Sequence, residues 1–212
     1  MTMKPLSFIP RLTLFAVATL LMSACATAPT PLDYFDFGPA PRTTTSAADN
    51  SIACELPALN LPDISSPNSL DSNLMLYRLL YANDQQTHAY ANHRWGMSPA
   101  QLVALRLKTR LAFDQKNPVR LIDNGLANPG GWQLRLDLTD FSQYFSDAGH
   151  SYAQLQLRAS VLHANNLIAQ TTFTRQANAD TPDAPAGAQA MRVATDALIT
   201  DLTSWLCKQP RP

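Results

Sequence analysis

Apolar and polar residues alternate along three stretches in the second half of the chain. The stretches are Trp132–Thr139, Ala153–Val161 and Leu167–Phe173. A period of two places one set of side chains in a core and the other in water, which predicts antiparallel strands with one buried face. Asn165–Asn166 suits a tight hairpin between the last two strands, because asparagine tolerates positive φ. We expect an irregular crossing over Asp140–His150.

Shorter apolar runs predict further strands in the first half. They cover residues 33–39, 73–81, 86–91 and 119–122, with a turn at 82–85. The segment 55–64 contains Pro57 and Pro62, which fit an edge strand or an extended segment rather than a central strand. Residues 39–53 are rich in Pro, Thr, Ser and Ala, and we expect a mobile loop there.

Two segments have the spacing of amphipathic helices. The first runs from Ser98 to about Phe113, with Ser98 as N-cap, Pro99 at the first helical position and Gln101 completing a capping box. Its apolar side includes Leu102, Val103, Leu105, Leu107 and Leu111. The second helix is predicted over 188–206, after a polar loop at 177–187, with apolar positions from Met191 to Trp205 that include Val193.

These elements predict an α+β fold. The expected architecture has two layers, an antiparallel sheet with both amphipathic helices packed on one face. Residues 33–212 are long enough for one domain of ordinary size, and the sequence contains no internal repeat or second domain.

The first 24 residues have the features of an export signal. Lys4 and Arg11 precede the apolar run Leu12–Met22, which is shorter than the roughly 20 residues that a spanning helix needs. Small residues then lead to Cys25, as in a bacterial lipobox, so we expect lipid on Cys25 and a Pro-rich tether over 25–32. The alternative is an ordinary signal cleaved nearby, with Cys25 incidental.

Two further cysteines remain once Cys25 is set aside. Cys54 and Cys207 form an even pair in a chain expected to enter an oxidising compartment, which predicts a disulfide. It would join the start of the domain to the end of the last helix. Two separate buried thiols are the alternative.

Chemistry-bearing residues do not form a recognisable catalytic or metal-binding motif. The four histidines, His88, His93, His150 and His163, lack metal-ligand spacing, and we expect surface positions for them. Asp137 is predicted on the solvent face of a strand, and we therefore do not expect it to act in a catalytic acid–base pair. The chain has 16 basic and 16 acidic residues, which gives no electrostatic case for nucleic-acid binding. We therefore expect no cofactor and no enzymatic activity.

Several short motifs, taken in order, resemble the ABC-type transport auxiliary lipoprotein family. After the lipobox they are Tyr34–Pro39, Leu70–Asp71, Leu74–Arg78, Tyr90–Gly96, Leu134–Phe141 and Ser204–Leu206. The resemblance covers nearly all of the mature chain. Within this resemblance, Arg94 and Trp95 are the best candidates for a family-typical element. They either contact a partner protein, or Trp95 packs in the core and Arg94 pairs with a carboxylate.

The resemblance implies a non-enzymatic partner of an MCE-type lipid transport system. Such a lipoprotein would be held on the periplasmic side of the outer membrane, a location that Ala26 after the cysteine favours. It would dock an MCE-domain protein and its ABC permease and ATPase, and assemble as a homo-oligomer. Two alternatives remain, a stand-alone lipid-binding lipoprotein with cargo between helix and sheet, and a periplasmic hydrolase with a non-standard site.

Overall fold

A computed structural model describes residues 30–39, 54–112, 119–122 and 131–210. The chain divides into two compact units, Met1–Pro31 and Leu32–Pro212, and the architecture below is that of the second. The predicted signal, the lipidated Cys25 and nearly all of the loop predicted at 39–53 lie outside the described residues.

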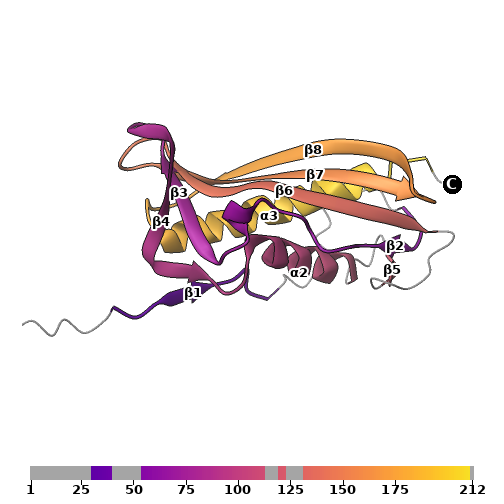
Figure 1. Ribbon diagram of the computed structural model, residues 1–212, viewed down its shortest axis with the longest axis horizontal. Coiled ribbons are helices and arrows are strands. Elements are labelled where there is room, and N and C mark those ends of the chain that lie inside the picture. The colour runs from indigo at the N-terminus through magenta and orange to yellow at the C-terminus, as the bar shows by residue number, and fades with distance from the viewer. Residues whose placement is uncertain (1–29, 40–53, 113–118, 123–130, 211–212) are drawn as a thin grey trace, which may run out of the picture. The chain divides into compact units, whose positions relative to one another are not determined.

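In the part of the chain that the structure describes, eight strands form one sheet, with the order β1-β4-β3-β6-β2-β5 and with β7 and β8 following on the other side of β6 (Figure 1). They are β1 (Asp33–Phe35), β2 (Leu59–Asn60), β3 (Leu74–Leu79), β4 (Asn83–Trp95), β5 (Leu121–Ile122), β6 (Trp132–Phe145), β7 (Ser151–His163) and β8 (Asn166–Asn178). The long ladders β6–β7–β8 and the β3–β4 hairpin are antiparallel, as the alternation predicted. The short pairings β1–β4, β2–β5, β2–β6 and β3–β6 are parallel.

Both helices, α2 (Pro99–Ala112) and α3 (Ala184–Leu206), cover the same face of the sheet (Figure 1). The predicted α+β class with two helices on one sheet face is therefore confirmed. A short 3₁₀ helix, η2 (Asn68–Leu70), precedes β3. As predicted, α2 begins at Pro99, and Gln101 Oε1 accepts a 3.2 Å hydrogen bond from Ser98 N–H.

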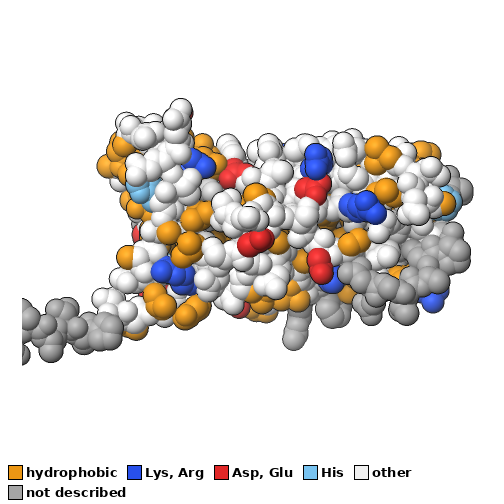
Figure 2. Space-filling model, in the orientation of Figure 1, with side chains coloured by type: hydrophobic (Ala, Val, Ile, Leu, Met, Phe, Trp, Pro, Cys, Tyr) orange, Lys and Arg blue, Asp and Glu red, His pale blue; other side chains and the backbone are white. Residues whose placement is uncertain are grey.

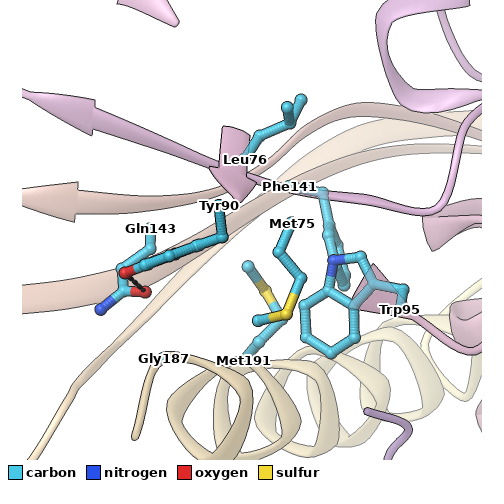
Figure 3. A pocket seen from close by; sticks show the side chains of 8 residues that line it. All are labelled: Met75, Leu76, Tyr90, Trp95, Phe141, Gln143, Gly187 and Met191. Atoms are coloured by element: carbon cyan, nitrogen blue, oxygen red, sulfur yellow. Dashed lines mark hydrogen bonds between the residues drawn. The ribbon is translucent and has the colours of Figure 1, made fainter. Parts of the chain in front are cut away.

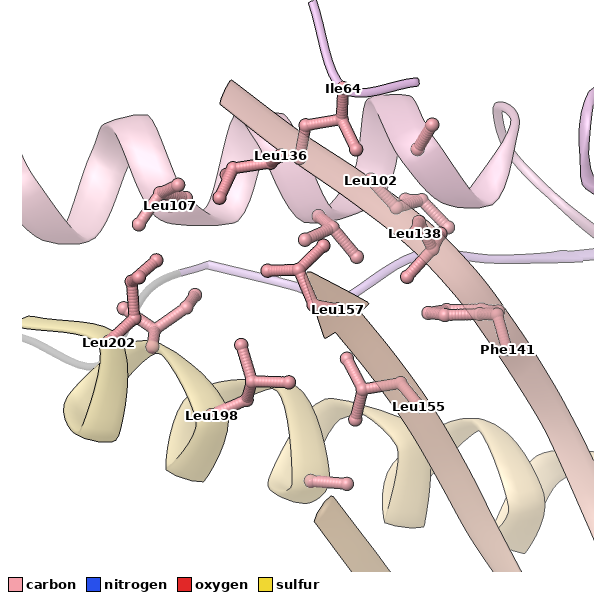
Figure 4. Close-up of a cluster of buried hydrophobic side chains, with 14 of the residues drawn as sticks. Ile64, Leu102, Leu107, Leu136, Leu138, Phe141, Leu155, Leu157, Leu198 and Leu202 are labelled. Carbon is pink, nitrogen blue, oxygen red and sulfur yellow. The ribbon is translucent and has the colours of Figure 1, made fainter. Parts of the chain in front are cut away.

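Leucines from both layers fill the space between helices and sheet (Figure 4). Leu138 of β6, Leu155 and Leu157 of β7 and Leu198 of α3 are completely inaccessible to solvent. Two residues assigned to the apolar helix faces lie outside this core, since Leu105 is 56% and Val193 51% exposed. The α2 face that meets the core instead includes Arg106, which reaches across to α3.

The strand β6 continues through the region predicted as an irregular crossing. A register shift between Leu138 and Asp140 inserts one extra residue against β7. Leu138 and Phe141 therefore both face the core although they are three residues apart, and a strict period of two fails at this point. The prediction of a crossing over Asp140–His150 was wrong, because only the turn at 146–150 is irregular.

Several other element boundaries differ from the predicted ones. The turn between β3 and β4 lies at 80–82, and β4 extends to Trp95 instead of leading early into the helix. The β7–β8 turn has positive φ at Ala164 and Asn165, one residue before the predicted pair. The polar loop predicted at 177–187 shrinks to 179–183, because Asp183 caps α3 by accepting a 2.8 Å bond from Ala186 N–H.

The proline-rich segment contributes a two-residue strand, β2. It lies between β5 and β6 rather than at an edge. Pro57 and Pro62 bracket β2, so neither proline interrupts the paired residues. The predicted disulfide closes this region: Cys54, just before β2, is bonded to Cys207 at the end of α3, with a Cα–Cα distance of 5.8 Å.

Candidate docking surface

Arg94 lies at a bend in β4 that the sequence did not reveal. Leu74 of β3 pairs with Arg94 and Leu76 pairs with Ala89, so two steps along β3 face five steps along β4. The extra backbone forms a large bulge. The Arg94 guanidinium donates to the carbonyl oxygens of Tyr90 at 2.5 Å and His93 at 2.8 Å. The Arg94 side chain thus supplies hydrogen bonds to backbone carbonyl groups in the bulge.

Trp95 follows the bulge and points into the core. It is 3% exposed, and its ring lies 5.3 Å from that of Phe141 and 6.1 Å from that of Phe37 in edge-on geometry. The core interpretation of Trp95 is therefore the correct one. For Arg94 the acceptors are backbone carbonyls in place of the expected carboxylate. Both residues of the family-typical element shape β4, and the predicted partner contact of Arg94 remains a prediction.

A cavity beside Trp95 lies between the sheet and α3 (Figure 3). Its lining is mostly apolar and aromatic: Met75, Leu76, Tyr90, Trp95, Phe141, Gln143, Gly187 and Met191. Its volume is about 10 Å³, which holds about one water molecule. Ligand cavities for molecules of drug size occupy roughly 300–1,000 Å³. This cavity is therefore far too small for lipid, and it does not support the stand-alone lipid-binding alternative.

A buried amide closes one end of the cavity (Figure 3). Gln143 is 4% exposed. Its Oε1 accepts from Tyr90 Oη at 3.0 Å, and its Nε2 donates to Ser151 Oγ at 2.8 Å and to the Asp183 carbonyl at 3.1 Å. Burial, reinforced by Tyr77 and Asp183, raises the pKa of Tyr90 well above its usual value. The phenol therefore stays protonated and remains a donor.

Gly187 of α3 makes room for this amide. A Cβ at this position would lie 2.0 Å from Gln143 Oε1. We expect Gly187→Ala to destabilise the domain by about 1–3 kcal/mol, because Gln143 must move and give up its buried hydrogen bonds. Urea unfolding measures the change. Gly149→Ala is the control, since its Cβ would make an ordinary 3.5 Å contact. Equal stability of the two variants would contradict the close-packing role of Gly187.

His88, His150 and Asp137 each contact different residues. His150 bonds Asp147 at 2.9 Å within the exposed β6–β7 turn, and His88 stacks on Tyr77 at 5.1 Å. Asp137, on the outer sheet face, accepts from Ser65 Oγ and from Arg158 Nε. These bonds lower the pKa of Asp137, the Ser65 bond most of all. Among the described residues no three His, Cys, Asp or Glu side chains converge as metal ligands, and nothing in this arrangement favours the hydrolase alternative.

Exposed apolar side chains mark surfaces that the sequence did not reveal. Leu80 and Tyr81, 37% and 53% exposed, lie in the β3–β4 turn although the strand pattern assigned them to a strand. Figure 2 shows hydrophobic side chains gathered at this end of the module. Tyr34 on β1 is 60% exposed, and Leu167 at the start of β8 is 59% exposed. Only the strand order and turn positions reveal that these residues are free of the core.

The described residues thus form an α+β module with a buried apolar core and exposed apolar side chains in its turns. No helix in the described part of the chain is both long and apolar enough to cross a membrane.

The chain belongs to the family of ABC-type transport auxiliary lipoprotein components, whose family model matches residues 35–203. Among solved structures it is similar to the protein XCC0632 from Xanthomonas campestris, with a TM-score of 0.63 and 18% identity over 84% of this chain and 91% of that one. A second crystal structure, of an uncharacterised protein, gives a TM-score of 0.62 and 11% identity over 84% and 99%. At these identities the two structures support the fold alone. No curated protein matches the sequence.

Proposed function

We propose that this protein is a non-enzymatic lipoprotein, anchored through lipid on Cys25 to the periplasmic side of the outer membrane. There it docks, as a homo-oligomer, the periplasmic end of an MCE-type lipid transporter powered by an ABC permease and ATPase. The observation that carries the proposal is the family match over 35–203, directly after a lipobox-like sequence. The small volume of the Trp95 cavity agrees with docking rather than carrying cargo.

Affinity purification of the full chain from native membranes tests the docking role. We expect an MCE-domain protein and ABC components to co-purify with a C-terminally tagged copy. Lipid extraction of the same sample should give no stoichiometric lipid beyond that covalently attached. Recovery of bound lipid without any transport component would overturn the docking role and favour the lipid-binding alternative.

The anchor itself makes a separate prediction. Cys25→Ser should abolish labelling by palmitate and leave an unprocessed precursor, because no other residue supplies the acylated thiol. Ala26→Asp is the matched control: it should keep the label and move the protein to the inner-membrane fraction. Metabolic labelling and membrane fractionation measure both. A processed Cys25→Ser protein that stays bound to the outer membrane would rule out the lipid anchor.

A further inference from the structure

We infer that the free edge of β8 pairs with the β8 edge of a second copy of this chain, joining the two sheets antiparallel across a two-fold axis near Thr172. Within the described residues β8 pairs with β7 alone, so its other edge presents a row of backbone groups without a partner strand (Figure 1). Such a row is a template for a further strand. Asn166–Asn178 makes this edge 13 residues long.

The other edges of the sheet are blunted in the ways that prevent such pairing. The strand β1 has three residues and β5 has two. The part of β4 that β1 leaves uncovered is distorted by two register shifts against β3. By contrast, the β7–β8 register runs without a shift from Asn178 to Ala169. Bulges and shortness protect an edge, whereas a long regular strand does not.

The sequence of β8 also has few of the residues that discourage pairing at an edge strand. The strand contains no Pro and no Gly, and Arg175 is its single charged residue. Arg175 forms an ion pair with Asp201 of α3, so its charge is already held against its own helix. Its residues with high β-propensity are Ile168, Thr171, Thr172, Phe173 and Thr174. The edge is thus nearly neutral, and it is regular from Ala169 to Asn178.

The sequence of β8 is compatible with its own copy in the antiparallel direction. A register that places Thr172 opposite Thr172 pairs the regular stretch Ala169–Arg175 with the same stretch of the second copy. It puts Gln170 opposite Thr174, so polar side chains meet on the outer face. It also puts Arg175 opposite Ala169, so the two arginines do not face each other. Direct like-charge opposition, which would disfavour a self-pair, is therefore absent.

On the outer face of the sheet, amide and hydroxyl side chains already form hydrogen bonds between β7 and β8 of one chain. Gln170 Nε2 donates to Ser160 Oγ at 2.7 Å, and Gln156 Nε2 donates to Thr174 Oγ1 at 3.1 Å. Cross-strand amide–hydroxyl pairs of this kind would continue from β8 to the β8 of the second copy. The pairing thereby extends an existing surface pattern across the two-fold axis.

A charge exchange at Thr172 tests the pairing. Two differently tagged wild-type full-length copies, co-expressed and extracted in mild detergent, should co-purify. Thr172→Lys alone and Thr172→Glu alone should each lose most co-purification, since like charges would lie directly opposite. Co-expression of the Lys variant with the Glu variant should restore it. Thr139→Lys is the control, since Thr139 is exposed on the central strand β6 and should leave co-purification unchanged.

Each outcome decides the inference. Wild-type copies that stay separate, or variants that associate as well as wild type, would overturn self-pairing through β8. Loss in both variants without restoration in the mixture would overturn the register about Thr172, provided that their thermal melts match the control. A different protein captured at this edge would show that another occupant pairs there. This inference names the surface for the self-association proposed above, but the experiment needs no transport partner, so its failure leaves the transport proposal standing.

Discussion

Replacing both Cys54 and Cys207 by serine should lower the free energy of unfolding by about 4–5 kcal/mol. The two residues are 153 apart in sequence, so their bond closes nearly the whole folded domain into one loop. Loop-closure entropy grows with the length of the loop, and a cross-link of this length removes much of the freedom of the unfolded chain. The 5.8 Å Cα–Cα distance lies within the usual range for disulfides.

The bond also joins two segments that lie far apart in the sequence. Cys54 lies just before β2, which has only two residues. Cys207 is the C-cap of α3, a helix that packs on β7 and β8. Losing the bond therefore removes the direct link between the segment before β2 and the end of α3.

Urea unfolding of oxidised and reduced wild type, beside the double variant, measures the effect. Reduced wild type and the double variant should unfold at the same, lower urea concentration. The m-value should stay constant or rise, because an uncross-linked unfolded chain exposes more surface. A loss below 1 kcal/mol would show that the unfolded chain is compact enough to make the cross-link redundant.

Elements that depend on neighbouring residues could be predicted from the sequence. Residues 153–161 alternate without interruption and lie within strand β7. The first helix begins where Ser98, Pro99 and Gln101 indicated. The disulfide followed from counting cysteines after the lipobox. In each case the deciding interactions lie within a few residues, or depend on composition alone.

Features that depend on contacts between residues far apart in the sequence could not be predicted from the sequence. The bulge at Thr139 depends on the pairing of β6 with β7, and the bulge in β4 depends on β3. Arg94 has a role only because the β4 bulge leaves carbonyls for it to bind. The free edge of β8 is equally hidden, since the alternation at 167–173 predicts a strand but not its place in the sheet. Candidate interaction surfaces therefore emerged only with the topology.

A second large effect is expected at the ion pair that joins the two helices. Arg106 of α2 is 5% exposed and forms two hydrogen bonds with Asp196 of α3, at 2.8 and 2.7 Å. Its remaining Nη1 group donates to the Gly38 carbonyl at 3.3 Å. The guanidinium thus connects both helices and the segment after β1. Removing the carboxylate would leave a buried cation without its counter-ion, which costs far more than a surface pair contributes.

We therefore expect Asp196→Asn to destabilise the domain by about 3–5 kcal/mol. Asp147→Asn is the matched control, because Asp147 pairs with His150 where both side chains are more than half exposed, and its loss should leave stability almost unchanged. Denaturant unfolding measures both. The double variant Arg106→Met with Asp196→Leu separates burial from pairing: it should be more stable than Asp196→Asn alone, because no unpaired charge remains. If the double variant is the least stable of the three, the ion pair itself, and not the penalty of an orphaned cation, holds α2 against α3.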